Sequence, residues 1–79
     1  MIDEMDRRIL KCIVERDGFA SLNTIASAVS EDERTIEDTY EPYLIQIGFL
    51  SRTSRGRSLT RKAYEYLGLA PNESQRALF

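Results

Sequence analysis

The apolar residues of this 79-residue sequence change their spacing at Gly48, and this change constrains the fold more than any other feature. Before Gly48 they recur every three or four residues, as they do along one face of an α-helix. After it come short runs of strand-forming residues on either side of a turn that contains glycine. We therefore predict antiparallel pairing between Phe49–Thr53 and Arg57–Thr60, across the turn Ser54–Gly56.

Three helical segments are predicted before this hairpin. Asp3 can cap a first helix of about 14 residues, which ends at Asp17-Gly18, and Ser21 is a good N-cap for a short second helix. The run Ser30-Glu31-Asp32-Glu33 has the pattern of a capping box and predicts the start of the third helix. The apolar faces comprise Met5, Ile9, Leu10, Ile13 and Val14; then Leu22, Ile25, Ala26 and Val29; and finally Ile36, Tyr40, Tyr43, Leu44 and Ile47.

Pro42 interrupts the third helix. A proline inside a helix removes one hydrogen bond and clashes with the preceding turn, at about 3 kcal/mol. The alternative is a new helix that begins at Pro42. We expect a kink near Asp38–Tyr40, because the apolar stripe continues in phase past the proline.

The order of elements predicts a fold that is mainly α with a small β-hairpin. Gly48 can end the third helix, and Thr60 can cap a last helix that Gly68 closes. The predicted architecture is a winged helix-turn-helix over residues 1–69, with three helices, a two-stranded wing and a C-terminal helix. Residues 70–79 are polar and are predicted to be a loose tail.

The composition argues against catalysis by this chain. It has no histidine and a single cysteine, Cys12, so it cannot build a zinc site or an internal disulfide. No glycine is followed by Lys-Ser or Lys-Thr, as in a phosphate-binding P-loop, and no apolar run reaches the roughly 20 residues needed to cross a bilayer. Its carboxylates are expected to be solvated on helix surfaces, and Cys12 to be a small buried hydrophobe. We predict no enzyme activity, no cofactor and no metal for this chain, and a reducing cytoplasmic location.

The charge is divided unevenly along the chain. The sum is −2, from 11 basic and 13 acidic residues. The third helix carries six acidic residues between Glu31 and Glu41 and one basic residue, Arg34. The wing region carries no acidic residue and five basic ones: Arg52, Arg55, Arg57, Arg61 and Lys62. Phosphates would repel such a helix, so the predicted DNA contacts are Arg52, Arg55 and Arg57, with Arg61, Lys62 and Arg34 as secondary candidates. Solvated charge on a hairpin edge remains the alternative.

Several sequence runs resemble the C-terminal domain of the RuvB family, the bacterial motors of Holliday-junction branch migration. The longest is EPYLIQIGFLSRTSRGR at Glu41–Arg57. The others are DEMDRRIL at Asp3–Leu10, TIED at Thr35–Asp38 and AYEYLGL at Ala63–Leu69. The resemblance covers Ile2–Leu69, and it departs from the family where Ser54 replaces the usual proline of the wing and where Gly18–Leu22 is shorter.

This resemblance implies a DNA-contacting module of an ATP-dependent helicase of the AAA+ class. It implies that the wing arginines, here Arg52 and Arg57 with Arg55 between them, touch DNA. It also implies that the parent protein forms a hexameric ring, works with RuvA and RuvC in recombination and repair, and binds ATP and Mg²⁺ in a separate ATPase domain. The chain alone is expected to be a monomer, with no membrane contact.

Two other functions remain open from the residues alone. One is a free-standing winged-helix transcription regulator, although the acidic third helix and the lack of a dimerisation segment argue against it. The other is a protein-interaction module that uses Tyr40, Tyr43 and Tyr64 as surface anchors. Core packing at helical spacing is the alternative for these tyrosines.

Overall fold

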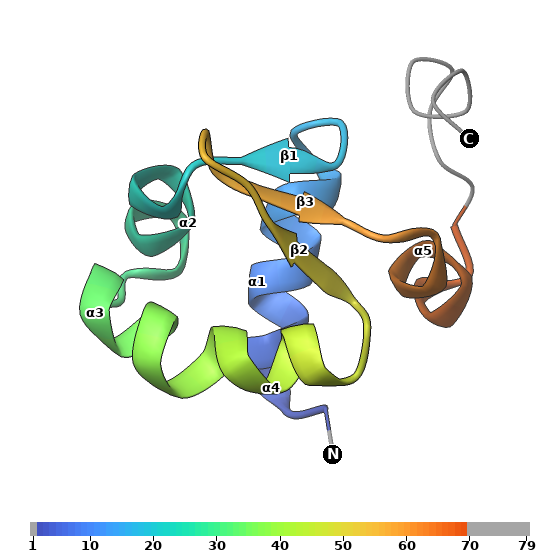
Figure 1. The fold of residues 1–79 in the computed structure, drawn as a ribbon, viewed down its shortest axis with the longest axis horizontal. Helices are drawn as coiled ribbons and strands as arrows, with labels where there is room; N and C mark the ends of the chain where they lie inside the picture. Colours follow the sequence, from blue (N-terminus) through green and yellow to red (C-terminus); the bar gives the residue numbers. More distant parts are fainter. Residues whose placement is uncertain (1, 70–79) are drawn as a thin grey trace.

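A computed structural model describes residues 2–69 and shows a winged-helix fold. The elements are α1 (Glu4–Val14), β1 (Phe19–Ala20), α2 (Leu22–Val29), α3 (Glu33–Thr35), η1 (Ile36–Tyr40), α4 (Glu41–Gln46), β2 (Leu50–Arg52), β3 (Arg57–Leu59) and α5 (Arg61–Leu67). Helix α1 contacts α2, β1 and β3, and it passes behind the strands in the view of Figure 1. The predicted fold class is confirmed, whereas the predicted tail at 70–79 lies outside the described residues.

Three of the four predicted N-caps, at Asp3, Ser21 and Thr60, are confirmed. Asp3 caps α1 in a capping box with Asp6, and the Ser21 side chain accepts a hydrogen bond from the Thr24 N–H at 3.1 Å. Burial raises the pKa of the Asp6 carboxyl. The third cap was predicted at Ser30 and is wrong, because Ser30 is left-handed (φ +56°) and ends α2 instead. Asp32 caps α3 in its place, accepting from the Arg34 N–H at 3.0 Å.

The third predicted helix consists of α3, η1 and α4, which follow one another without a break. The middle part, η1, is a π-helical turn, and it includes the stretch Asp38–Tyr40 where Pro42 was expected to kink the helix. Pro42 is the second residue of α4 and has no N–H to donate to a carbonyl of the preceding turn. The helix thus accommodates the proline by widening the preceding turn.

The wing belongs to a three-stranded antiparallel sheet with the order β1-β3-β2. Strands β2 and β3 pair in the predicted region, with Leu50 opposite Leu59 and Arg52 opposite Arg57. The prediction of only two strands is corrected, because β1 pairs with the other side of β3 through Ala20 and Arg57. The wing is therefore attached to the segment that joins α1 to α2 (Figure 1).

The hydrophobic core lies between the helices and the sheet. Its largest fully buried apolar side chains come from three helical segments: Ile9, Leu10 and Ile13, then Ile25, then Ile36 and Leu44. Tyr64 is buried, and Tyr40 and Tyr43 pack partly buried against the core, which favours the packing role over surface anchoring. Cys12 is buried as predicted, and burial raises the pKa of its thiol, which disfavours the reactive thiolate.

Candidate nucleic-acid interface

A tight turn at Thr53–Gly56 forms the tip of the wing. The Thr53 N–H and hydroxyl both donate to the Gly56 carbonyl, at 2.8 and 3.0 Å. The same hydroxyl accepts hydrogen bonds from the N–H groups of Arg55 and Gly56, at 3.3 and 3.1 Å. This closed turn projects the Arg55 side chain into solvent.

Gly56 seats the wing against the body of the domain. A Cβ atom at this position would lie 2.7 Å from the carbonyl oxygen of Ala20 and 3.0 Å from the Cα of Ser21. Both atoms belong to backbone, which cannot rotate away as a flexible side chain can. Gly56 is therefore required for the close approach of the wing turn to the end of β1.

We predict that Gly56→Ala lowers the free energy of unfolding by about 1–3 kcal/mol, the usual cost of overpacking. Urea denaturation followed by circular dichroism measures this change. Ser54→Ala is the matched control, because Ser54 is exposed in the same turn and surface changes usually stay within about 0.5 kcal/mol. Equal stabilities of the two variants would show that the contact with Ala20 is loose.

Two wing arginines converge on one buried carboxylate. Glu41 has no exposed side-chain surface, and its Oε2 accepts from the Nε of Arg57 at 2.6 Å. Its Oε1 accepts from the Nη2 of Arg52 at 2.9 Å. Arg57 is itself buried, with 8% of its side chain exposed, and its Nη2 lies 3.4 Å from the Oε2 of Glu37. Glu41 thus joins both wing strands to α4.

The π-helical turn explains why Glu41 faces inward. In a regular α-helix, residues five positions apart lie about 140° apart around the axis. In η1 the Glu41 N–H instead donates to the Ile36 carbonyl, five residues back. This wider turn brings Glu41 onto the buried side of the helix, with Ile36 and Leu44.

The three wing arginines differ in their access to solvent. Arg55 is exposed, and its guanidinium forms no ion pair or hydrogen bond with residues 2–69. Arg52 keeps 46% of its side chain exposed while one nitrogen binds Glu41. Arg57 is held by Glu41 and Glu37, so its predicted contact with phosphate stays a prediction that requires at least one of these carboxylates to release it.

The secondary candidates lie apart from the wing turn. Arg61 and Lys62 are exposed in the first turn of α5, and the Lys62 ammonium lies 5.9 Å from the ring centre of Phe49. Arg34 is 88% exposed in α3, where it pairs with Asp38 at 3.5 Å. Arg34 thus lies among acidic neighbours of its own helix, whereas Arg55 at the wing tip has no acidic partner within the described part of the chain.

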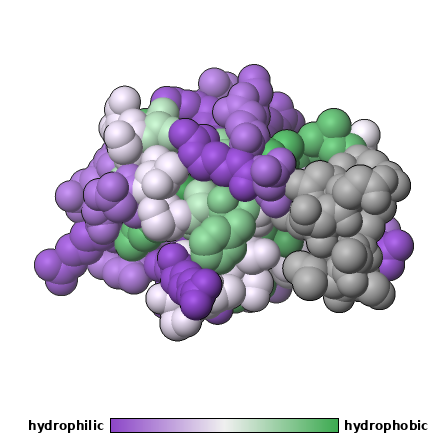
Figure 2. Space-filling view, turned by 90° about the horizontal axis from the view of Figure 1, so that it is seen from above, coloured by the Kyte–Doolittle hydropathy of each residue, from purple (hydrophilic) through white to green (hydrophobic). Residues whose placement is uncertain are grey.

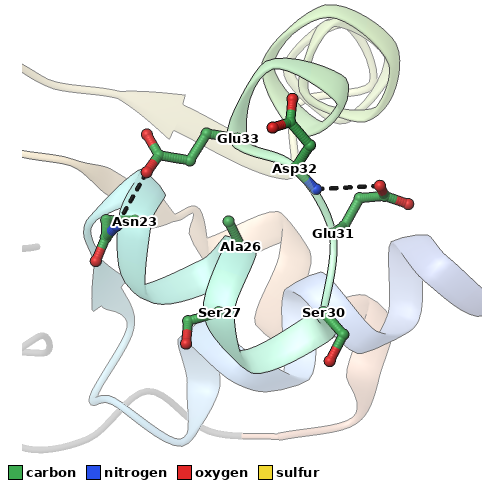
Figure 3. Close-up of a pocket in the computed structure, with 7 residues that line it drawn as sticks. All are labelled: Asn23, Ala26, Ser27, Ser30, Glu31, Asp32 and Glu33. Carbon is green, nitrogen blue, oxygen red and sulfur yellow. Dashed lines mark hydrogen bonds between the residues drawn. The ribbon is translucent and has the colours of Figure 1, made fainter.

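A polar hollow occupies the corner between α2 and α3 (Figure 3). Its lining contains no cation and three carboxylates, those of Glu31, Asp32 and Glu33. Glu33 accepts a hydrogen bond from the Asn23 amide at 2.9 Å, and Glu31 accepts one from the Asp32 N–H at 3.1 Å. This side of the helix-turn-helix therefore presents negative charge, which disfavours contact with phosphates.

The side of the molecule that carries the wing turn is mainly hydrophilic. Figure 2 looks down on the β1 and wing-turn side of Figure 1 and shows mainly hydrophilic side chains around a smaller hydrophobic area.

Within residues 2–69, no cluster of three or more metal-ligating side chains is found. Nor does any helix in that range have the length and apolar character needed to cross a bilayer.

Sequence reasoning missed the ion pairs beneath the wing. It treated all six acidic residues of Glu31–Glu41 as solvated, which is wrong for Glu41. Glu37 is only half-exposed and faces Arg57. The available signal was Pro42, because a proline inside a helix makes the preceding turn irregular. Ile36 and Glu41 lie five positions apart in that turn, a spacing that would not put them on the same side of a regular α-helix.

Comparison with known proteins identifies the family to which this fold belongs. Residues 2–68 match the family model described as the RuvB C-terminal winged helix domain. The Holliday junction branch migration complex subunit RuvB of Chloroflexus aggregans is 56% identical over 70 residues, which are 86% of this chain and 20% of the relative. The corresponding subunit of Trichormus variabilis is 51% identical over 79 residues, or 98% of this chain and 22% of the relative.

A solved structure of Thermotoga maritima RuvB, the Holliday junction branch migration motor, has the same fold. It superposes with a TM-score of 0.81 at 46% identity, over 87% of this chain and 24% of that chain. The present chain thus spans less than a quarter of the length of these relatives. It belongs to the RuvB family and is the C-terminal winged-helix domain of such a protein.

Proposed function

We propose that this domain holds duplex DNA in a motor that drives branch migration of Holliday junctions during recombination and repair. It does so by laying its wing on the phosphate backbone. The observation that supports the proposal best is the exposed guanidinium of Arg55 at the wing tip, which has no partner within residues 2–69, together with the half-exposed Arg52. Guanidinium groups bind phosphate oxygens in a bidentate manner.

The charge distribution supports contact through the wing and not through the helix-turn-helix corner. Arg52 at the end of β2 and Arg55 at the wing tip are exposed, and no acidic residue occurs between positions 52 and 62. The corner between α2 and α3 presents three carboxylates instead. Contact with backbone phosphates alone carries no base readout, so the proposed binding is independent of DNA sequence.

The names of the relatives support a role for this domain within a larger complex. They are named as subunits of the Holliday junction branch migration complex. We extend this to a hexameric ring that cooperates with RuvA and RuvC in the bacterial cytoplasm. In this motor, ATP and Mg²⁺ bind in the part of the protein that this chain does not span, and the isolated chain is a monomer without enzyme activity.

We predict weak binding of a short duplex by the 79-residue chain, with a dissociation constant of roughly 10⁻⁴ M at physiological salt. The logarithm of the affinity should fall with the logarithm of salt concentration, with a slope of about −1.8 for two phosphate contacts and about −2.7 for three. Fluorescence anisotropy gives the slope, and chemical-shift mapping gives the surface.

The mapping separates the two faces of the domain. Shifts should concentrate at Arg52–Arg57 and leave the hollow around Asn23 and Ser27 unchanged. If the largest chemical-shift changes lie in α2 and α3 and the wing residues show none, the wing is excluded as the DNA contact. A binding curve that depends on DNA sequence would favour a transcription regulator.

A further inference from the structure

The two carboxylates that hold Arg57 differ in strength. Glu41 is fully buried and lies 2.6 Å from Nε, whereas Glu37 is 44% exposed and lies 3.4 Å from Nη2. A long ion pair with a half-exposed carboxylate is weak, because water and salt screen it. A buried charge that loses its partner is far more costly. The Arg57–Glu37 pair is therefore the one that can exchange.

We propose that Glu37 occupies a phosphate position on Arg57 and is displaced by the DNA backbone. This inference rests on the proposed function of the wing. In the free domain the Glu37 carboxylate lies on the outer nitrogen, Nη2, of Arg57. A phosphate oxygen is the anion that would replace it there, while Glu41 keeps its hold on Nε.

This exchange gives Arg57 two separate tasks. Its inner nitrogen fixes β3 to α4 in both states, so the wing does not have to rearrange when DNA binds. Its outer nitrogen adds a third phosphate contact to those of Arg52 and Arg55. Glu37 lowers the affinity of the free domain for phosphate, because it must leave before the third contact forms.

The test compares duplex binding by the wild type with three variants: Glu37→Gln, Glu37→Asp and Glu65→Gln. Glu65 is exposed on α5, so Glu65→Gln has the same change of net charge away from Arg57. Glu37→Asp keeps the charge but shortens a side chain whose contact is already 3.4 Å. We expect both Glu37 variants to bind about two- to fivefold more tightly than the wild type, the ratio that corresponds to an exposed ion pair. Glu65→Gln should stay within about 1.5-fold of the wild type, since screening weakens remote charges.

Three outcomes would overturn the exchange. Glu37→Gln and Glu65→Gln could have equal effects, which would make Glu37 one surface charge among others. Glu37→Asp could match the wild type, which would show that charge matters and contact does not. Weaker binding together with lower thermal stability in both Glu37 variants would make Glu37 a purely structural support.

Failure of the exchange differs from failure of the proposed function. Wild-type binding at the wing, with unperturbed Arg57 side-chain NMR signals, removes only the exchange. Absence of wing shifts in all four proteins removes both the function and the exchange.

Discussion

Replacing Glu41 by alanine is expected to lower the free energy of unfolding by about 3–5 kcal/mol, because Arg57 would remain buried without its main counter-charge. A domain of this length is stable by about 4–12 kcal/mol, so this single change removes at least about a quarter of the total stability. Urea denaturation at 25 °C measures the loss. Glu65→Ala, an exposed carboxylate on α5, is the control and should stay near the wild type.

A double variant distinguishes the lost ion pair from a simple cavity. Glu41→Leu combined with Arg57→Met removes both charges and keeps apolar volume, so it should recover much of the stability that either single change loses. The double-mutant cycle gives the coupling energy directly. A Glu41→Ala variant within about 1 kcal/mol of the wild type would show that the buried pair contributes little.

Changing both Arg52 and Arg55 to glutamine is expected to weaken duplex binding at least tenfold, beyond about 10⁻³ M at physiological salt. Two fewer phosphate contacts should make the salt slope shallower by about 1.8. In a full-length relative with the matching substitutions, branch migration should fall while basal ATP hydrolysis changes much less. Anisotropy titrations over a range of salt concentrations give both quantities for the chain itself.

The control for this variant is Arg7→Gln with Lys11→Gln, which removes two exposed positive charges from α1. An equal loss of affinity in the control would mean that net charge and not the wing determines binding. Charge reversal at Arg57 is not a usable test. It would place a third carboxylate beside Glu41 and Glu37, and the fold would be lost before DNA binding could be read.

Local signals in the sequence were sufficient for the helices and the hairpin. Asp3, Ser21 and Thr60 cap helices through their own side chains, and a cap needs only neighbouring residues. Strand β1 was missed because it has two residues, and its pairing partner lies almost forty positions away. No periodicity can be read from so short a segment.

The site could be predicted only in part for a related reason. Counting charges along the chain located the basic wing and the acidic helix, but it could not tell which carboxylates face which arginines. That depends on the π-helical turn, which changes the side of the helix on which Glu41 lies. One extra residue in the helical turn decides whether Glu41 is a solvated carboxylate or the buried partner of Arg57.

The central position of β3 also determines how the domain bears a mechanical load. A tensile force on the turn Thr53–Gly56 passes into β3, which β1 and β2 hold from opposite sides by antiparallel hydrogen bonds. It passes into α4 as well, through the ion pair of Arg57 with Glu41. The turn cannot peel away as a free hairpin would, because these attachments must fail together. In the proposed motor, the wing is therefore a stiff lever that transmits displacement between DNA and the body of the domain.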